Sequence, residues 1–195
     1  MDNGNFGDEQ FIYCIGMQSK PVHVNSFSDG YIIIDDEKLE IKRRRVLNKQ
    51  ISVIMPEKFV VLEKELAELK YPTSDRPNEI YTNYDTTINF SLSHRNETAS
   101  NEDIPEIKDM LQDIILRMYP TSKTKDSAVI DVSGLTIAYF DFSTAAIDMD
   151  VYNATFVFSL GGRLVLGAFN CPQENADDWK LVFIQMLQSI ELANH

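Results

Sequence analysis

The sequence predicts an α+β fold, a three-layer α/β/α sandwich with a largely antiparallel sheet. Two segments with helical apolar spacing lie on either side of four strand-like runs, a pattern that predicts helices packed on a sheet. The runs are joined in pairs by Ser133-Gly134 and Gly161-Gly162, and two-residue connections of this kind are typical of antiparallel hairpins. The second hairpin is apolar on both faces, so we expect helices to cover both sides of the sheet.

Two regions are predicted along the chain. Residues 1–47 form an N-terminal extension with short β-like pieces separated by polar breaks, and residues 48–195 form the sandwich domain. The domain opens with Ile51–Met55, a predicted strand that Pro56 ends. A first helix, stopped by a Tyr-Pro pair, is predicted from four apolar residues at helical spacing: Phe59, Leu62, Leu66 and Leu69. Two further strands, 79–82 and 87–93, are expected to pair as a hairpin.

Two longer helices are expected to lie on the sheet, because each has one wide apolar stripe and one polar face. Acidic residues in the first turn of each helix suit the positive end of its dipole. The stripe of the first helix consists of Ile107, Met110, Leu111, Ile114, Ile115 and Met118. The stripe of the second consists of Trp179, Val182, Phe183, Met186, Leu187 and Ile190.

The Gly161-Gly162 turn also predicts which residues face each other. A two-residue turn places Phe156 opposite Gly167 on one face and Val157 opposite Leu166 on the other. Large side chains therefore meet small ones across the pair, and neither face is polar enough to be left in water.

This order of elements resembles the sandwich shared by the photosystem II subunit PsbP, the bacterial lipoprotein DcrB and the Ran-binding nuclear-transport factor of yeast. The resemblance covers about residues 50–192 and rests on Ile51–Pro56, the Gly161-Gly162 hairpin and the closing helix from Trp179 to Ile190. The stretch from Lys70 to Asn83 is similar to uncharacterised bacterial proteins of Firmicute type. The resemblance implies a protein that binds other proteins or supports an assembly. The resemblance assigns no functional residue to this chain, because the sequence matches none of the contact motifs of those family members.

The composition removes several classes of function. The 195 residues include 30 acidic and 18 basic side chains, a net charge of −12, so nucleic acid and anionic membranes are excluded as expected partners. No apolar run is long enough to span a bilayer, and acidic residues precede the apolar stretch 11–17, so no secretory signal is expected. We therefore expect a cytoplasmic protein. Cys14 and Cys171 are expected as reduced thiols, with a single disulfide as the alternative.

Candidate catalytic residues are scattered. The three histidines, at positions 23, 94 and 195, lack metal-ligand spacing, and the nucleophile-elbow and phosphate-loop motifs are absent. Cys171 could be activated only by a distant base such as His94. Asp131 and Asp141 could act as an acid–base pair only if the strands brought them together, and the predicted pairing of Asp131 with Thr136 is against this. The sequence predicts no cofactor and no metal.

One basic run interrupts this acidic chain. It consists of Lys42, Arg43, Arg44 and Arg45. Such a run fits either a patch that docks an acidic partner or a charged edge strand that discourages strand pairing, and we favour the second interpretation.

The function predicted from these features is that of a non-catalytic protein-binding or assembly module whose partner is a protein. The alternative is a small hydrolase that uses Cys171 or the scattered carboxylates in a cleft. A homodimer formed through a sheet edge is a third hypothesis.

Overall fold

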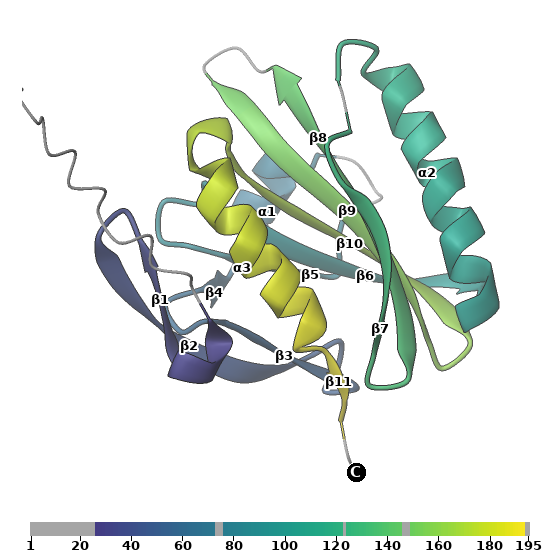
Figure 1. Ribbon diagram of the computed structural model, residues 1–195, viewed down its shortest axis with the longest axis horizontal. Coiled ribbons are helices and arrows are strands. Elements are labelled where there is room, and N and C mark those ends of the chain that lie inside the picture. Colours follow the sequence, from purple (N-terminus) through teal and green to yellow (C-terminus); the bar gives the residue numbers. More distant parts are fainter. Residues whose placement is uncertain (1–25, 73–75, 123, 146–148, 194–195) are drawn as a thin grey trace, which may run out of the picture.

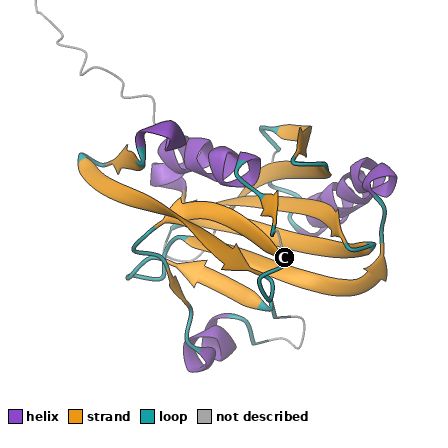
Figure 2. Ribbon diagram, turned by 90° about the horizontal axis from the view of Figure 1, so that it is seen from below, coloured by secondary structure: helices purple, strands orange, loops and turns teal. Residues whose placement is uncertain are grey.

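Strands dominate the structure, a computed structural model that describes residues 26–72, 76–122, 124–145 and 149–193. They form two antiparallel sheets with helices on both sides (Figure 2). The smaller sheet has the order β1-β2-β3-β11. Its strands are β1 (Tyr31–Ile34), β2 (Glu37–Val46), β3 (Ile51–Pro56) and β11 (Glu191–Leu192).

The larger sheet has seven strands in the order β4-β5-β6-β10-β9-β8-β7. They are β4 (Val60–Val61), β5 (Glu79–Thr82), β6 (Asn89–Thr98), β7 (Ser127–Val132), β8 (Leu135–Ala145), β9 (Asp150–Leu160) and β10 (Arg163–Pro172). The helices are α1 (Lys64–Lys70), α2 (Ile104–Met118) and α3 (Ala176–Gln188). Single 3₁₀ turns, η1 (Phe27–Asp29), η2 (Asn101–Asp103) and η3 (Gln173–Asn175), precede β1, α2 and α3.

The β9–β10 hairpin has the predicted register. Phe156 pairs with Gly167 and Val157 pairs with Leu166. Gly161 and Gly162 have φ angles of 59° and 76°, the left-handed conformation that a two-residue turn of this type requires. The predicted β5–β6 and β7–β8 hairpins are also present.

Helices cover both faces of the large sheet, so the predicted α+β sandwich is confirmed. Phe156 and Phe158 belong to a large core with Phe183 of α3, whereas Val157, between them, packs with Ile104 of α2. Figure 1 shows α3 crossing the front of the sheet and α1 lying behind it. The small sheet lies on the same side of the large sheet as α3, because Ile32 of β1 belongs to the same core as Phe183 of α3.

The described part of the N-terminal extension is part of this fold. β2 pairs with β3 from Ile41 opposite Pro56 to Val46 opposite Ile51, and Ile32, Ile34 and Val46 are buried in the main core. The division predicted between residues 47 and 48 therefore falls within the β2–β3 turn. Residues 1–25, which include Cys14 and His23, lie outside the described residues.

Two helical predictions need correction. The first helix begins at Lys64 and not near Phe59, because Val60–Val61 form β4 and pair with β5, while Phe59 enters the main core. On α2 only part of the predicted stripe reaches the sheet. Ile107 and Leu111 pack toward Val157, but three members of the stripe remain at least half exposed: Met110, Ile114 and Met118.

Candidate functional site

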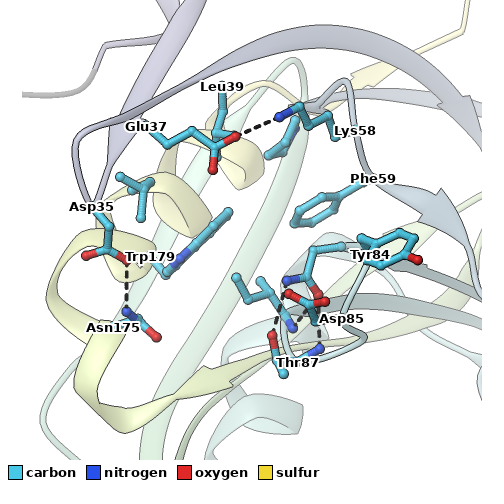
Figure 3. A pocket seen from close by; sticks show the side chains of 14 residues that line it. Asp35, Glu37, Leu39, Lys58, Phe59, Tyr84, Asp85, Thr87, Asn175 and Trp179 are labelled. Atoms are coloured by element: carbon cyan, nitrogen blue, oxygen red, sulfur yellow. Dashed lines mark hydrogen bonds and ion pairs between the residues drawn. The ribbon is translucent and has the colours of Figure 1, made fainter.

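A cleft of about 410 Å³ opens on the α3 side of the molecule, where four separate segments meet (Figure 3). The segments are the β1–β2 turn, the β3–β4 connection, the β5–β6 loop and the start of α3. Its size lies within the range of ordinary ligand sites. The side chains that give it chemical character are Asp35, Glu37, Lys58, Phe59, Tyr84, Asp85, Asn175 and Trp179.

The floor of the cleft is aromatic. The rings of Phe59 and Trp179 are stacked with centroids 5.9 Å apart and planes inclined by 24°. Trp179 also lies against Phe169 of β10, at a centroid distance of 6.2 Å. Both floor residues are almost completely buried, so only a small part of each ring borders the cavity, and the core holds both rings in place.

Carboxylates form the rim. Asp35 and Asp36 make the tight β1–β2 turn with φ angles of 50° and 63°, and Asn175 at the start of α3 donates a hydrogen bond from Nδ2 to Asp35 Oδ2 over 3.3 Å. Glu37, just after the turn, accepts an ion-paired hydrogen bond from Lys58 Nζ at 2.6 Å. The turn chemistry therefore fixes two carboxylates beside the aromatic floor.

The opposite wall is the β5–β6 loop, which Asn83 organises. Its Oδ1 accepts hydrogen bonds from the backbone N–H groups of Thr87 and Ile88, each at 3.0 Å. The loop places Asp85 on the rim and leaves Tyr84 95% exposed. The cleft thus combines three carboxylates with a single lysine that already pairs with one of them, and it has the charge and the aromatic surface that favour a cation.

The basic run lies on β2, and strand geometry divides it between two faces. Lys42 is opposite Met55 and Arg44 is opposite Val53, while Arg43 and Arg45 project from the other face of the strand. The four side chains therefore do not form one continuous patch.

Two members of the run are used to hold the fold together. Arg43 Nη1 donates hydrogen bonds to Ser52 Oγ at 3.1 Å and to the Ser189 carbonyl at 2.9 Å, and it lies 2.9 Å from a carboxylate oxygen of Glu191. Arg44 Nη2 donates to the carbonyl of Glu57 at 2.5 Å. Arg45 lies exposed beside Arg43 in a shallow groove. A docking role for the run stays a prediction.

Replacing Arg43 with serine is expected to lower the free energy of unfolding by about 1–2 kcal/mol, because its guanidinium joins β3, the end of α3 and β11. Arg45→Ser removes the same charge from the same face of β2 and serves as the matched control, with an expected change within about 0.5 kcal/mol. Urea denaturation of both variants measures the difference. Equal losses would show that Arg43 has no special structural role.

The proposed nucleophile and base lie far apart. His94 on β6 is opposite Val165 of β10, and Cys171 is six residues further along β10, about 20 Å away at strand spacing. The imidazole Nε2 of His94 instead lies 3.2 Å from the carbonyl of Leu160. Burial raises the pKa of the Cys171 thiol to about 12, so the thiolate needed for nucleophilic chemistry is disfavoured.

Asp131 and Asp141 also lie apart. Asp131 is opposite Thr136, whose hydroxyl donates to it at 2.9 Å, and Asp141 is five residues further along β8, about 17 Å away. Asp141 is almost completely buried. Its Oδ1 accepts hydrogen bonds from the backbone N–H groups of Lys125 and Asp126, at 2.8 and 2.7 Å.

The other oxygen of Asp141 lies within a buried polar network. Lys180 Nζ donates to Asp141 Oδ2 at 2.9 Å and lies 3.4 Å from Asp126, and the Tyr152 hydroxyl donates to the same Oδ2 at 3.3 Å. Partial burial alone would lower the pKa of Lys180, but the hydrogen bond and charge of Asp141, together with Asp126, raise it. Burial, reinforced by the Asp141 charge, raises the pKa of Tyr152 as well. This network joins β8, β9, α3 and the segment before β7.

Within the described ranges, His, Cys, Asp and Glu side chains nowhere gather in a group of three that would hold a metal ion. His195 lies outside those ranges. Among the helices of the described residues, we find none that is long and apolar enough to cross a membrane.

Two antiparallel sheets with covering helices define a PsbP-like α+β fold, and comparison with solved structures supports this class. The solution structure of cyanobacterial PsbP (CyanoP) from Synechocystis sp. PCC 6803 matches with a TM-score of 0.57 at 11% identity, over 78% of this chain and 92% of that one. A crystal structure from Bacteroides thetaiotaomicron VPI-5482 matches with a TM-score of 0.52 at 12% identity, over 79% of this chain. The match spans about half, 49%, of that second protein.

Identities this low show the shared fold alone. The predicted resemblance to the PsbP-like fold is therefore confirmed, whereas the Firmicute origin has no support, since neither match comes from that group. No protein-family model and no curated protein matches the chain. The cleft was not predicted from the sequence, because its residues come from four segments that only the fold brings together.

Proposed function

We propose that the protein is a non-catalytic binding module and that its cleft receives a positively charged side chain, lysine or arginine, of a protein partner. The observation that supports this most directly is the arrangement of Asp35, Glu37 and Asp85 around the stacked rings of Phe59 and Trp179. A cation between carboxylates and aromatic rings gains both charge pairing and cation–π attraction.

The surroundings of the cleft favour the same ligand. The net charge of −12 attracts basic partners over long range and raises their association rate. Lys58 neutralises part of the rim through Glu37, but Asp35 and Asp85 come from opposite walls of the cleft. A long flexible cationic side chain can reach between those walls while its alkyl stem lies on the aromatic floor.

Trp179 is the only tryptophan of the chain, so its emission reports on the cleft floor directly. The experiment titrates the protein with short peptides that are identical except for a central arginine, lysine, glutamine or glutamate. We expect the arginine and lysine peptides to change the emission in a saturable way, and the glutamate peptide to leave it unchanged. Equal responses to lysine and glutamine peptides would contradict the proposal.

Asp35→Asn tests the rim without disturbing the turn, because asparagine adopts the left-handed conformation readily. We expect the affinity for the cationic peptides to fall about fivefold, equivalent to ~1 kcal/mol for one partly exposed charge. Asp131→Asn removes an exposed carboxylate on β7, away from the cleft, and is the matched control. If both variants bound equally well, Asp35 would have no part in recognition. The cytoplasmic location and the homodimer stay predictions.

A further inference from the structure

The outer side of α2 carries a row of apolar side chains that the fold does not use. Met110, Ile114 and Met118, here called the α2 ridge, are 54%, 50% and 65% exposed. Residues four apart on a helix lie one above the other, so the three form a continuous line along most of the helix. Figure 1 shows α2 at one edge of the molecule, with the strands of the large sheet on one side of it.

The sheet accounts for only part of the apolar surface of α2. Ile104 is fully buried, and Ile107 and Leu111 pack toward Ala138 and Val157. An amphipathic helix that only covered a sheet would need no apolar side chains beyond these. Methionine is flexible and polarisable, and it is common on surfaces that adapt to a partner. The α2 ridge is therefore a candidate docking surface.

Acidic side chains run beside the α2 ridge. Glu106, Asp109 and Asp113 are exposed and lie about one turn apart, on the flank turned away from the sheet. Lys108, which reaches Asp109 at 2.6 Å, also donates a hydrogen bond to Ser127 on the opposite flank. Lys108 therefore offsets part of the Asp109 charge, and Arg117 lies at the end of the helix, so the negative charge of the flank comes mainly from Glu106 and Asp113.

We propose that the α2 ridge docks an amphipathic helical segment of a partner protein, one whose apolar stripe is bordered by lysine and arginine. The apolar stripe of that segment would pack on Met110, Ile114 and Met118, and its basic border would face Glu106 and Asp113, with Asp109, which Lys108 already pairs, between them. The α2 ridge lies on the opposite face of the large sheet from the cleft, so this proposal does not depend on the function proposed for the cleft.

Charge distinguishes this occupant from two others. A second copy of the chain would bring a second acidic α2 flank against the first, and each copy carries a net charge of −12. The chain's own residues 1–25 contain an apolar stretch, but with acidic residues at positions 2, 8 and 9 against a single lysine, Lys20, they also have the wrong charge. A basic segment satisfies both the apolar row and its acidic border.

The test measures binding of labelled synthetic peptides to the full-length protein by fluorescence anisotropy. The first probe is a 15-residue helical peptide, the length of α2, with a leucine stripe bordered by lysine. The second has glutamate in place of every lysine, and the third has the composition of the first with its stripe dispersed. We expect the first to bind at least tenfold more tightly than either of the others, with an affinity that falls as salt is added.

Variants locate the binding. Ile114→Ser is expected to weaken the binding of the first peptide at least tenfold, because Ile114 is the central residue of the α2 ridge. Asp109→Lys combined with Asp113→Lys should remove the preference for the lysine peptide over the glutamate peptide. Leu69→Ser, at a leucine of α1 that is 80% exposed, is the matched control and should leave binding unchanged. These are surface positions, where substitution changes stability little.

Several results would overturn the proposal. They are equal binding of the lysine and glutamate peptides, equal binding of the dispersed peptide, or no effect of Ile114→Ser. Light scattering that showed a dimer dissociated by Ile114→Ser would make a second copy the occupant instead. Tighter peptide binding by a full-length variant carrying Phe11→Asp and Ile15→Asp would show that the chain's own residues 1–25 are the occupant of the α2 ridge and compete with the peptide.

Discussion

Asp141→Ala is expected to lower the free energy of unfolding by about 3–5 kcal/mol, one of the two largest effects predicted for this chain. The substitution leaves the partly buried backbone N–H groups of Lys125 and Asp126 without their acceptor. It also removes the nearer of the two carboxylates that pair with the Lys180 ammonium, and the acceptor of the Tyr152 hydroxyl. Each buried polar group left without a hydrogen bond costs about 1–3 kcal/mol, and the losses occur together.

Lys180→Ala should have a smaller effect, about 2 kcal/mol, because its head group is partly exposed and the Asp141 carboxylate keeps its other donors. Because the pKa of Lys180 is raised in the folded chain, its contribution to stability is complete at neutral pH. That contribution is lost only as the pH rises through the folded-state pKa. The double variant should lose about 1–3 kcal/mol less free energy of unfolding than the two single variants together. This difference is the interaction energy between Asp141 and Lys180.

Urea denaturation followed by the emission of the buried Trp179 measures these changes. Asp131→Ala is the control, because Asp131 is exposed on the adjacent strand, and a change within about 0.5 kcal/mol is expected. Asp141→Asn keeps one acceptor oxygen and stays measurable if the alanine variant does not fold. A loss below 1 kcal/mol for both Asp141 variants would show that the network does not stabilise the fold.

The sequence predicts the large sheet well because local features determine it. Gly161-Gly162 fixes the β9–β10 register, and alternation then places Phe156 and Val157 on opposite faces, which the structure shows to be the α3 side and the α2 side. The same alternation places Asp141 with Ile137 and Tyr139 on the α3 face, so a lone aspartate in an apolar strand is a sign of a buried polar contact. Its partner Lys180 could not be predicted, since that contact depends on how α3 crosses the sheet.

The small sheet and the cleft depend on contacts that the sequence does not encode locally. β2 is charged and half exposed, and its pairing with β1 and β3, the burial of Val46 and the hydrogen bonds of Arg43 and Arg44 incorporate it into the fold. The β1–β2 turn, Phe59, the β5–β6 loop and Trp179 are far apart in sequence, so the cleft depends on tertiary packing. An Asp-Asp pair between two strand-like pieces and a single tryptophan are the sequence features that could have indicated it.

Gly167→Ala is the second substitution with a large expected effect, a loss of about 3 kcal/mol. The predicted pairing of Phe156 with Gly167 is confirmed, and it leaves no room for a side chain at Gly167. A Cβ at this position would collide with the end of the Phe156 ring, which is fully buried and stacked on Phe90 at a centroid distance of 5.3 Å. The ring cannot move aside, because Phe183 of α3 lies against it at a centroid distance of 5.8 Å.

A double-mutant cycle separates this collision from the ordinary cost of replacing glycine. Phe156→Ala alone should cost about 4 kcal/mol through the cavity it leaves, and adding Gly167→Ala should then cost nothing further, because the alanine methyl group enters the vacated space. Gly134→Ala is the control: its Cβ would meet no atom within 4 Å, and its positive φ of 80° leads to an expected loss of about 1 kcal/mol in either background. Two results would contradict this account: a loss of stability for Gly167→Ala no larger than for Gly134→Ala, or an equal loss with and without the Phe156 ring. Either result would show that the close packing of large against small residues across β9 and β10 does not determine this core.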